Sequence, residues 1–412
     1  MEKENKKKKR KKKTKWIKFR HTVVRRCLAI FIKPIAMIMY GIKIEKFKEE
    51  QKRPYLILYN HQTAFDQFFV GLAFRQPIYY VASEDLFSNG FVSSLIRFLV
   101  EPIPIKKQAT DVAAVMNCIR IAKEGGSLAI APEGNRTYSG KTEYIAPSIA
   151  TLAKKIKLPI ALYRIEGGYG VQPRWSDKTR KGKMRSYVAR VIEPEEYATM
   201  PYEELFAAIE EGLYVNEGVA DAMFKSAKKA EYLERAMYVC PYCGLSEFES
   251  NGNEIECKQC HRKITYGEDK TLSGVGFEFP YRFITEWYDA QKKFVCALDL
   301  EKYLETPMYT DKARVSEVIV YKRKDLIKAE AEIKLYGNRI VIDEGKENSM
   351  HLPFDEISAV SVLGRNKLNI YHDRKIYQLK SDKRFNALKY VNMYYHYKNI
   401  SKGESDEQFL GL

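Results

Sequence analysis

The chain of 412 residues is too long for one ordinary hydrophobic core and predicts two or three domains. An apolar content of 45% is normal for a globular protein and allows a sizeable core. The formal net charge of +17 is uneven, because residues 1–20 hold twelve Lys or Arg and two Glu. This tail therefore carries +10 and leaves +7 for the rest, which indicates an anionic partner for the tail.

Residues 1–15 predict a solvated polybasic arm, and residues 16–45 an amphipathic helical region. Its apolar side comprises Trp16, Ile17, Phe19, Val23, Val24, Cys27, Leu28, Ile30 and Phe31, and its polar side Lys18, His21, Thr22, Arg25, Arg26 and Lys33. A basic arm before such a helix is typical of a helix on an anionic membrane surface. The alternatives are packing of the apolar side into a core, or nucleic-acid binding by the arm. The apolar segments are too short for a transmembrane helix, and no secretory signal is expected.

Residues 46–236 predict an α/β domain followed by a charged helical linker over 196–236. Helical segments such as 110–124 lie between strand-like apolar runs at 55–59, 78–82, 127–131, 159–165 and 184–192. Nearly continuous apolar strands that alternate with helices favour an αβ sandwich around a largely parallel sheet.

Four cysteines form two CxxC pairs separated by thirteen residues: Cys240, Cys243, Cys257 and Cys260. Four thiolates in two turns suit the tetrahedral geometry of Zn²⁺, so the pattern predicts a structural zinc ribbon over 237–268. Four sulfur ligands leave no position for a catalytic water. Residues 241–257 carry four Glu and no Lys or Arg, so we expect no nucleic-acid partner for this ribbon. No pattern of a disulfide framework is present, which favours a reducing compartment.

Residues 269–412 predict a mainly-β domain that ends in a helix. The predicted helices are 281–296 and 383–398, and strands are expected within 332–343, 350–363, 367–373 and 375–381. This order of elements resembles a pleckstrin-homology (PH) or GRAM-like domain in topology, without a diagnostic motif.

Polar residues follow two of the apolar runs of the α/β domain. The stretch "YNHQTAFDQ" places His61 just after the run at 55–59 and Asp66 five positions later. Neutral imidazole can take up a proton, and a carboxylate on the other ring nitrogen fixes its tautomer. The alternative is that the Asn-His pair only caps the following helix.

The second polar stretch, "APEGNRTYSG", follows the run at 127–131 and contains Glu133, Gly134 and Arg136. Strand ends of an α/β sheet face the crevice in which ligands bind. Arg136 offers two parallel N–H donors for a phosphate. Two such stretches in one sheet predict an active site, although a surface turn with a salt bridge is the simpler alternative for the second one.

Both stretches resemble motifs of the glycerolipid acyltransferases, the lysophosphatidic acid acyltransferase-like family. "NHQTAFD" is similar to the NHx4D box, and "PEGNRTYSG" is similar to the PEGTRS box. "EPIPIKK" (101–107) and "LPIALYRIEGG" (158–168) stand where the family has its second and fourth blocks. The resemblance covers about residues 16–195.

The resemblance implies transfer of a fatty acyl group from acyl-CoA or an acyl carrier protein to a lysophospholipid hydroxyl, with 1-acyl-glycerol-3-phosphate as the expected acceptor. His61 would be the general base and Asp66 its orienting partner. The expected phosphate-binding residues are Glu133, Gly134, Arg136, Lys106 and Lys107. This chemistry needs no cofactor, and the enzyme would be peripheral on the cytoplasmic face of a membrane. The alternative is a non-catalytic lipid- or protein-binding adaptor on a degenerate acyltransferase fold.

Overall fold

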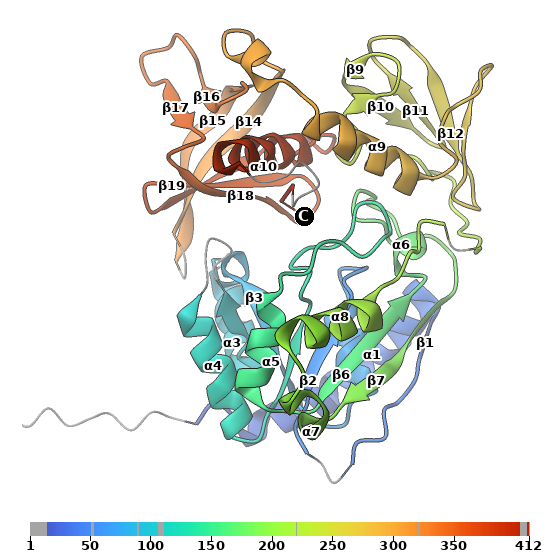
Figure 1. Ribbon diagram of the computed structural model, residues 1–412, viewed down its shortest axis with the longest axis vertical. Coiled ribbons are helices and arrows are strands. Elements are labelled where there is room, and N and C mark those ends of the chain that lie inside the picture. Colours follow the sequence, from blue (N-terminus) through green and yellow to red (C-terminus); the bar gives the residue numbers. More distant parts are fainter. Residues whose placement is uncertain are drawn as a thin grey trace, which may run out of the picture.

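A computed structural model describes residues 15–50, 53–88, 90–105, 111–219, 221–319, 322–403 and 410–411. Figure 1 shows an N-terminal α/β domain below, with a cysteine ribbon and a C-terminal β domain above it. Both upper parts lie on the side where strand β6 runs into helix α6. The predicted arm, apart from residue 15, and the predicted phosphate ligands Lys106 and Lys107 lie outside the described residues.

The α/β domain contains a seven-stranded sheet in the order β1-β7-β6-β2-β5-β3-β4. The strands are β1 (Ile42–Ile44), β2 (Leu56–Tyr59), β3 (Ile78–Ser83), β4 (Ile103–Ile105), β5 (Ser127–Ile130), β6 (Ile160–Glu166) and β7 (Met184–Ile192). All neighbouring pairs are parallel except β6 with β7, which confirms the largely parallel sheet. The apolar runs became strands because both faces of the sheet are covered.

Helices cover both faces of this sheet. They are α1 (Phe19–Tyr40), α2 (Asp66–Ala73), α3 (Phe91–Val100), α4 (Val112–Lys123), α5 (Ser148–Ile156), α6 (Gly168–Val171), α7 (Pro194–Ala198), α8 (Tyr202–Leu213) and the 3₁₀ turn η1 (Glu84–Phe87). Leu56 and Leu58 of β2 share a core with α4, α5 and α8, whereas Ile57 and Tyr59 share one with α1 and α2. This alternation along one strand confirms the αβ sandwich.

The predicted helical linker is wrong beyond Leu213, because α8 ends there and residues 214–236 contain only the 3₁₀ turn η2 (Leu233–Arg235) within their described part. Before η2, backbone groups of this segment bond to other loops. Glu217 donates its N–H to the carbonyl of Gly140 at 2.8 Å, and Phe224 donates to Glu268 at 2.8 Å. The segment therefore joins the α/β domain to the ribbon.

Most of the apolar side of helix α1 faces outward, whereas Trp16 and Ile17, just before the helix, pack against the core. Phe19 is 85% exposed and Ile38 is 84% exposed. Near its end, α1 packs on the domain through the buried Ala36 and Tyr40. Near its start, a polar residue faces the domain: His21 is 3% exposed, with its Nδ1 2.9 Å from the hydroxyl of Tyr79. Arg25 donates to backbone carbonyls of α2 and of the residue that follows it. Because these polar side chains of α1 bond to the domain, most of the apolar side of the helix faces away from it.

The cysteine ribbon pairs β8 (Val239–Cys240) with β9 (Gly244–Leu245), next to an antiparallel sheet of four strands. These are β10 (Phe248–Asn251), β11 (Glu254–Cys257), β12 (Lys263–Tyr266) and β13 (Leu272–Gly274). Helix α9 (Ile284–Cys296) packs on the ribbon through Trp287. Its indole N–H donates to the carbonyl of Val239 at 2.9 Å, and its ring lies edge-on to Phe248.

The C-terminal domain is an antiparallel sheet in the order β17-β16-β15-β14-β20-β19-β18, followed by a helix. Its elements are η3 (Leu300–Tyr303), β14 (Tyr309–Ile319), β15 (Arg323–Leu335), β16 (Arg339–Ile342), β17 (Met350–Pro353), β18 (Ile357–Leu363), β19 (Lys367–His372), β20 (Lys375–Lys380) and α10 (Leu388–Lys402). The mainly-β prediction with a final helix is confirmed. The expected strand at 350–363 is two strands, since the first ends at Pro353, and β14 was not predicted.

Candidate active site

His61 and Asp66 form a hydrogen-bonded pair at the carboxyl end of β2. His61 lies just beyond the strand, and Asp66 is the first residue of α2. The Nδ1 atom of His61 lies 2.8 Å from Oδ2 of Asp66. The imidazole side chain is 23% exposed and that of Asp66 is fully buried. One ring nitrogen therefore faces a carboxylate, and the Nε2 atom has no hydrogen-bond partner among the described residues.

The carboxylate of Asp66 is fixed by the turn that carries His61. It accepts the backbone N–H of Gln62 at 2.7 Å and the hydroxyl of Thr63 at 2.6 Å. Asn60 anchors the other side of the turn, because its side-chain amide makes two 2.8 Å hydrogen bonds with the backbone of Ile165 in β6. These bonds hold the pair rigidly against the sheet.

Glu133 joins the second polar stretch to the first. Its carboxylate accepts the backbone N–H of His61 at 2.7 Å and that of Glu143 at 2.8 Å. Burial raises the pKa of Glu133 to about 8, against these two bonds, which favour the ionised form. Gly134 shapes the turn with a φ of +68°, a conformation that favours glycine. Both carboxylate oxygens of Glu133 are thus engaged by backbone.

Arg136 lies beside this turn with a buried donor. Its Nη1 atom is buried and has no hydrogen-bond partner in the part of the chain that the structure describes. Burial lowers the pKa of Arg136 to about 10, and the charges of Arg174 and Arg365 act in the same direction. A buried guanidinium N–H without a partner is costly unless an anion completes it.

The electrostatic surroundings keep the imidazole of His61 neutral near pH 7. Burial lowers its pKa below the ordinary 6.5, the Asp66 carboxylate opposes that change, and the charges of Arg136 and Arg174 reinforce it. A neutral imidazole whose Nδ1–H bonds to Asp66 presents the lone pair of Nε2. That is the form a general base requires.

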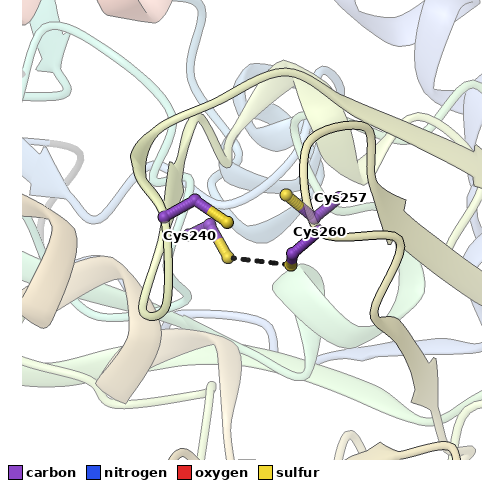
Figure 2. Close-up of side chains that lie close together, drawn as sticks. Cys240, Cys257 and Cys260 are labelled. Atoms are coloured by element: carbon purple, nitrogen blue, oxygen red, sulfur yellow. Dashed lines mark hydrogen bonds between the residues drawn. The ribbon is translucent and has the colours of Figure 1, made fainter.

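The four predicted metal ligands lie together in the ribbon. The sulfur atoms of Cys240, Cys243, Cys257 and Cys260 are all within 4.8 Å of one another. Figure 2 shows the side chains of Cys240, Cys257 and Cys260 pointing toward one another. The sulfur atoms of Cys240 and Cys260 are 3.8 Å apart. A tetrahedron with Zn–S bonds of about 2.3 Å has sulfur–sulfur edges of about 3.8 Å. The donor set and its spacing therefore fit a zinc ion.

The structure places His61, Asp66, Glu133, Gly134 and Arg136 beyond the carboxyl ends of the neighbouring strands β2 and β5, and it keeps the cysteines in a separate module. Arg174 was not predicted from the sequence. It follows the glycine-rich end of β6, and a polar stretch after a strand was the signal that identified the other two parts of the site. Arg365 was not predicted either, because it lies in another domain, far along the chain from the other site residues.

The comparisons with known proteins each cover less than half of the chain. The family model described as Acyltransferase matches residues 41–165. The curated 1-acyl-sn-glycerol-3-phosphate acyltransferase of Bacillus subtilis (strain 168) is 23% identical over 184 residues, 44% of this chain and 89% of that protein. The crystal structure of the 1-acyl-sn-glycerophosphate acyltransferase of Thermotoga maritima shares 23% identity at a TM-score of 0.40, covering 46% of this chain and 77% of that one.

The family model spans both polar stretches and the five predicted site residues that the structure gathers. Over residues 41–165, within its α/β domain, the chain therefore matches the acyltransferase family of enzymes.

Proposed function

We propose that the protein transfers a fatty acyl group from acyl-CoA or an acyl carrier protein to the hydroxyl of a lysophospholipid, with 1-acyl-glycerol-3-phosphate as the acceptor. The observation that carries this proposal is the His61–Asp66 pair, 2.8 Å apart, joined through Glu133 to the turn that holds Arg136. A base and an anion-binding group stand together there, as a phosphate-bearing alcohol requires. The curated relative acts on such an acceptor by its name.

In the proposed reaction, the acceptor hydroxyl gives its proton to Nε2 of His61 while its oxygen attacks the thioester carbonyl carbon. The tetrahedral intermediate then breaks its C–S bond, and the leaving thiolate takes the proton from the imidazolium. Asp66 stabilises the imidazolium and holds the ring in one tautomer. The acceptor is itself the nucleophile, so no acyl-enzyme forms.

Arg136, together with Lys106 and Lys107, is proposed to bind the acceptor phosphate before the reaction. Binding there places the hydroxyl near His61, so orientational entropy is lost before the transition state. We propose that Glu133 and Gly134 shape the site and do not contact the phosphate directly. The engaged carboxylate of Glu133 positions the backbone of His61, and Gly134 permits the turn.

Substitution of Arg136 tests the phosphate contact. We expect Arg136→Ala to raise the KM for 1-acyl-glycerol-3-phosphate by about 10–100-fold, because a charge-assisted bond made before the reaction is lost. The KM for the acyl donor should change little. Steady-state kinetics with each substrate varied in turn measures both constants. An unchanged acceptor KM would remove Arg136 from the phosphate site.

We also propose that α1 and α3 dock the protein on an anionic membrane surface at the cytoplasmic face. Among the described residues, no helix has the length and apolar character to cross a bilayer. Instead, α1 exposes Phe31 at 67% and Ile38 at 84%, and α3 exposes Phe91 at 80%. The two helices touch where Arg20 lies 4.5 Å from the ring centre of Phe98. Exposed apolar side chains beside basic ones suit an interfacial face.

Vesicle binding tests this face. Phe31→Glu with Ile38→Glu should weaken binding to phosphatidylserine-rich vesicles by at least tenfold, since each buried apolar side chain contributes about 1.5–3 kcal/mol. Removal of residues 1–15, or added salt, should weaken it further through the lost basic charges. The control is Val275→Glu, an exposed apolar residue of the ribbon. If the double variant and the control bind the vesicles equally well in a sedimentation assay, the assignment is contradicted.

The ribbon is proposed to bind one structural Zn²⁺ through Cys240, Cys243, Cys257 and Cys260. With all four positions of the tetrahedron filled by sulfur, the ion supplies folding free energy and takes no part in acyl transfer. The C-terminal domain, which has the strand-and-helix order of a PH or GRAM-like domain, is proposed to support or regulate the enzyme.

A further inference from the structure

The turn between β18 and β19 of the C-terminal domain lies against the stretch that carries Arg136. Figure 1 shows β18 on the side of that domain that faces the α/β domain. The contact is made by Arg174, which is 2% exposed. Its guanidinium donates to the carbonyl of Arg136 at 2.8 Å and to the carbonyls of Val362 and Gly364 at 3.2 Å each. One buried arginine thus ties the two domains together at the site.

Arg365, the next residue of that turn, is held in place from two sides. Its carbonyl lies 3.5 Å from the hydroxyl of Tyr138, two residues after Arg136. Its guanidinium is 3.2 Å from Asp177 and remains 32% exposed. Asp177 is shared, because the buried Arg235 donates to it at 2.7 Å. The guanidinium of Arg365 is therefore oriented and incompletely neutralised.

Three guanidinium groups, those of Arg136, Arg174 and Arg365, influence one another here, and Asp66 is the carboxylate that opposes them at Arg136. The charges of Arg174 and Arg365 both act on Arg136, and Arg136 and Arg174 act on His61. Like charges brought together at a half-buried place destabilise the fold unless they bind something negative. The buried Nη1 of Arg136 has no partner among the described residues, so the excess charge surrounds an unused donor.

We infer that the acceptor-binding site is composite: Arg365 of the C-terminal domain completes, with Arg136, a site for the phosphate monoester of the acceptor, and Arg174 positions both. This inference rests on the proposed function for the identity of the acceptor. Recognition by several arginines favours a dianionic phosphate monoester over a zwitterionic headgroup such as phosphocholine. Arg365 is then a specificity-determining residue outside the segment that the family model matches.

Kinetics with two acceptors tests this role. We expect Arg365→Ala to raise the KM for 1-oleoyl-glycerol-3-phosphate by about tenfold or more, with kcat nearly unchanged. The KM for lysophosphatidylcholine should stay the same. The ratio of kcat/KM between the two acceptors therefore becomes smaller, whereas a general loss of structure would affect both acceptors alike. Arg365→Lys should recover part of the effect. The control is Arg374→Ala, an exposed arginine in the next turn of the same domain.

Binding of glycerol 3-phosphate to the full chain, measured by calorimetry, tests the site without the reaction. We expect wild type and Arg374→Ala to bind it and Arg365→Ala to bind it at least tenfold more weakly. If Arg365→Ala binds glycerol 3-phosphate more weakly than wild type, but wild type acylates no lysophospholipid, the proposed function is refuted and the composite site stands. Equal binding by Arg365→Ala and wild type, or no binding by wild type, would overturn the inference.

Discussion

His61→Ala is expected to lower kcat by about 10²–10⁴-fold while the apparent affinity for the acceptor changes little. The imidazole takes up the hydroxyl proton only in the transition state, so its loss affects the rate and not the binding. Asp66→Asn should cause the same kind of loss, because the amide keeps the shape but not the charge that orients the ring at 2.8 Å. The control is His351→Ala, an exposed histidine of the C-terminal domain.

The pH dependence of kcat/KM gives this prediction a second readout. Burial lowers the pKa of His61 below 6.5, so the base is neutral at pH 7 and becomes protonated only as the pH falls further. Activity should therefore be level near neutrality and decline below pH 6.5. Because the Asp66 charge raises the pKa of His61, Asp66→Asn should move this decline to lower pH. Full activity in His61→Ala would reduce the pair to a helix cap.

Removal of zinc is expected to unfold the ribbon and to stop acyl transfer. Structural zinc contributes about 10–16 kcal/mol to the folding of zinc-finger peptides, more than most domains have in total. The effect should reach the active site through α9, since the Thr285 hydroxyl donates to the carbonyl of Ser139 at 2.8 Å. Ser139 belongs to the same stretch as Arg136. Cys257→Ser should lose the ion and the activity together.

Metal analysis of protein purified without added zinc should find one ion per chain, and a strong chelator should lower the Tm. Cys27→Ser is the matched control, because this cysteine is exposed on α1 and lies outside the cluster. It should keep the metal, the Tm and the activity. A folded protein with no metal and a Tm that does not respond to chelator would refute the zinc assignment.

The sheet and the candidate site could be predicted because local patterns determine them. Apolar runs such as 55–59 and 127–131 became β2 and β5, since a parallel sheet buried on both faces leaves no polar alternation to read. The CxxC pairs gave the cysteine cluster in the same way. His61 and Asp66 lie five positions apart, so the turn and the first residue of α2 suffice to bring them together.

Features that depend on distant contacts could not be predicted. The burial of His21, on the polar side of α1, depends on the hydroxyl of Tyr79, which lies 58 positions away in the chain. The two carboxylate bonds of Glu133 go to backbone atoms 72 and 10 positions away. Arg174 and the turn at Gly364 are 190 positions apart. No periodicity or motif encodes such pairings.

Acylation of a panel of lysophospholipids by the purified full chain, with labelled acyl-CoA and acyl carrier protein as donors, tests the central claim most directly. The account predicts labelled phosphatidic acid from 1-acyl-glycerol-3-phosphate with wild type and with His351→Ala, and a product rate lower by at least about 10²-fold with His61→Ala. No labelled product from any acceptor with either donor, by folded wild type that binds membranes, would contradict it and would favour a non-catalytic adaptor.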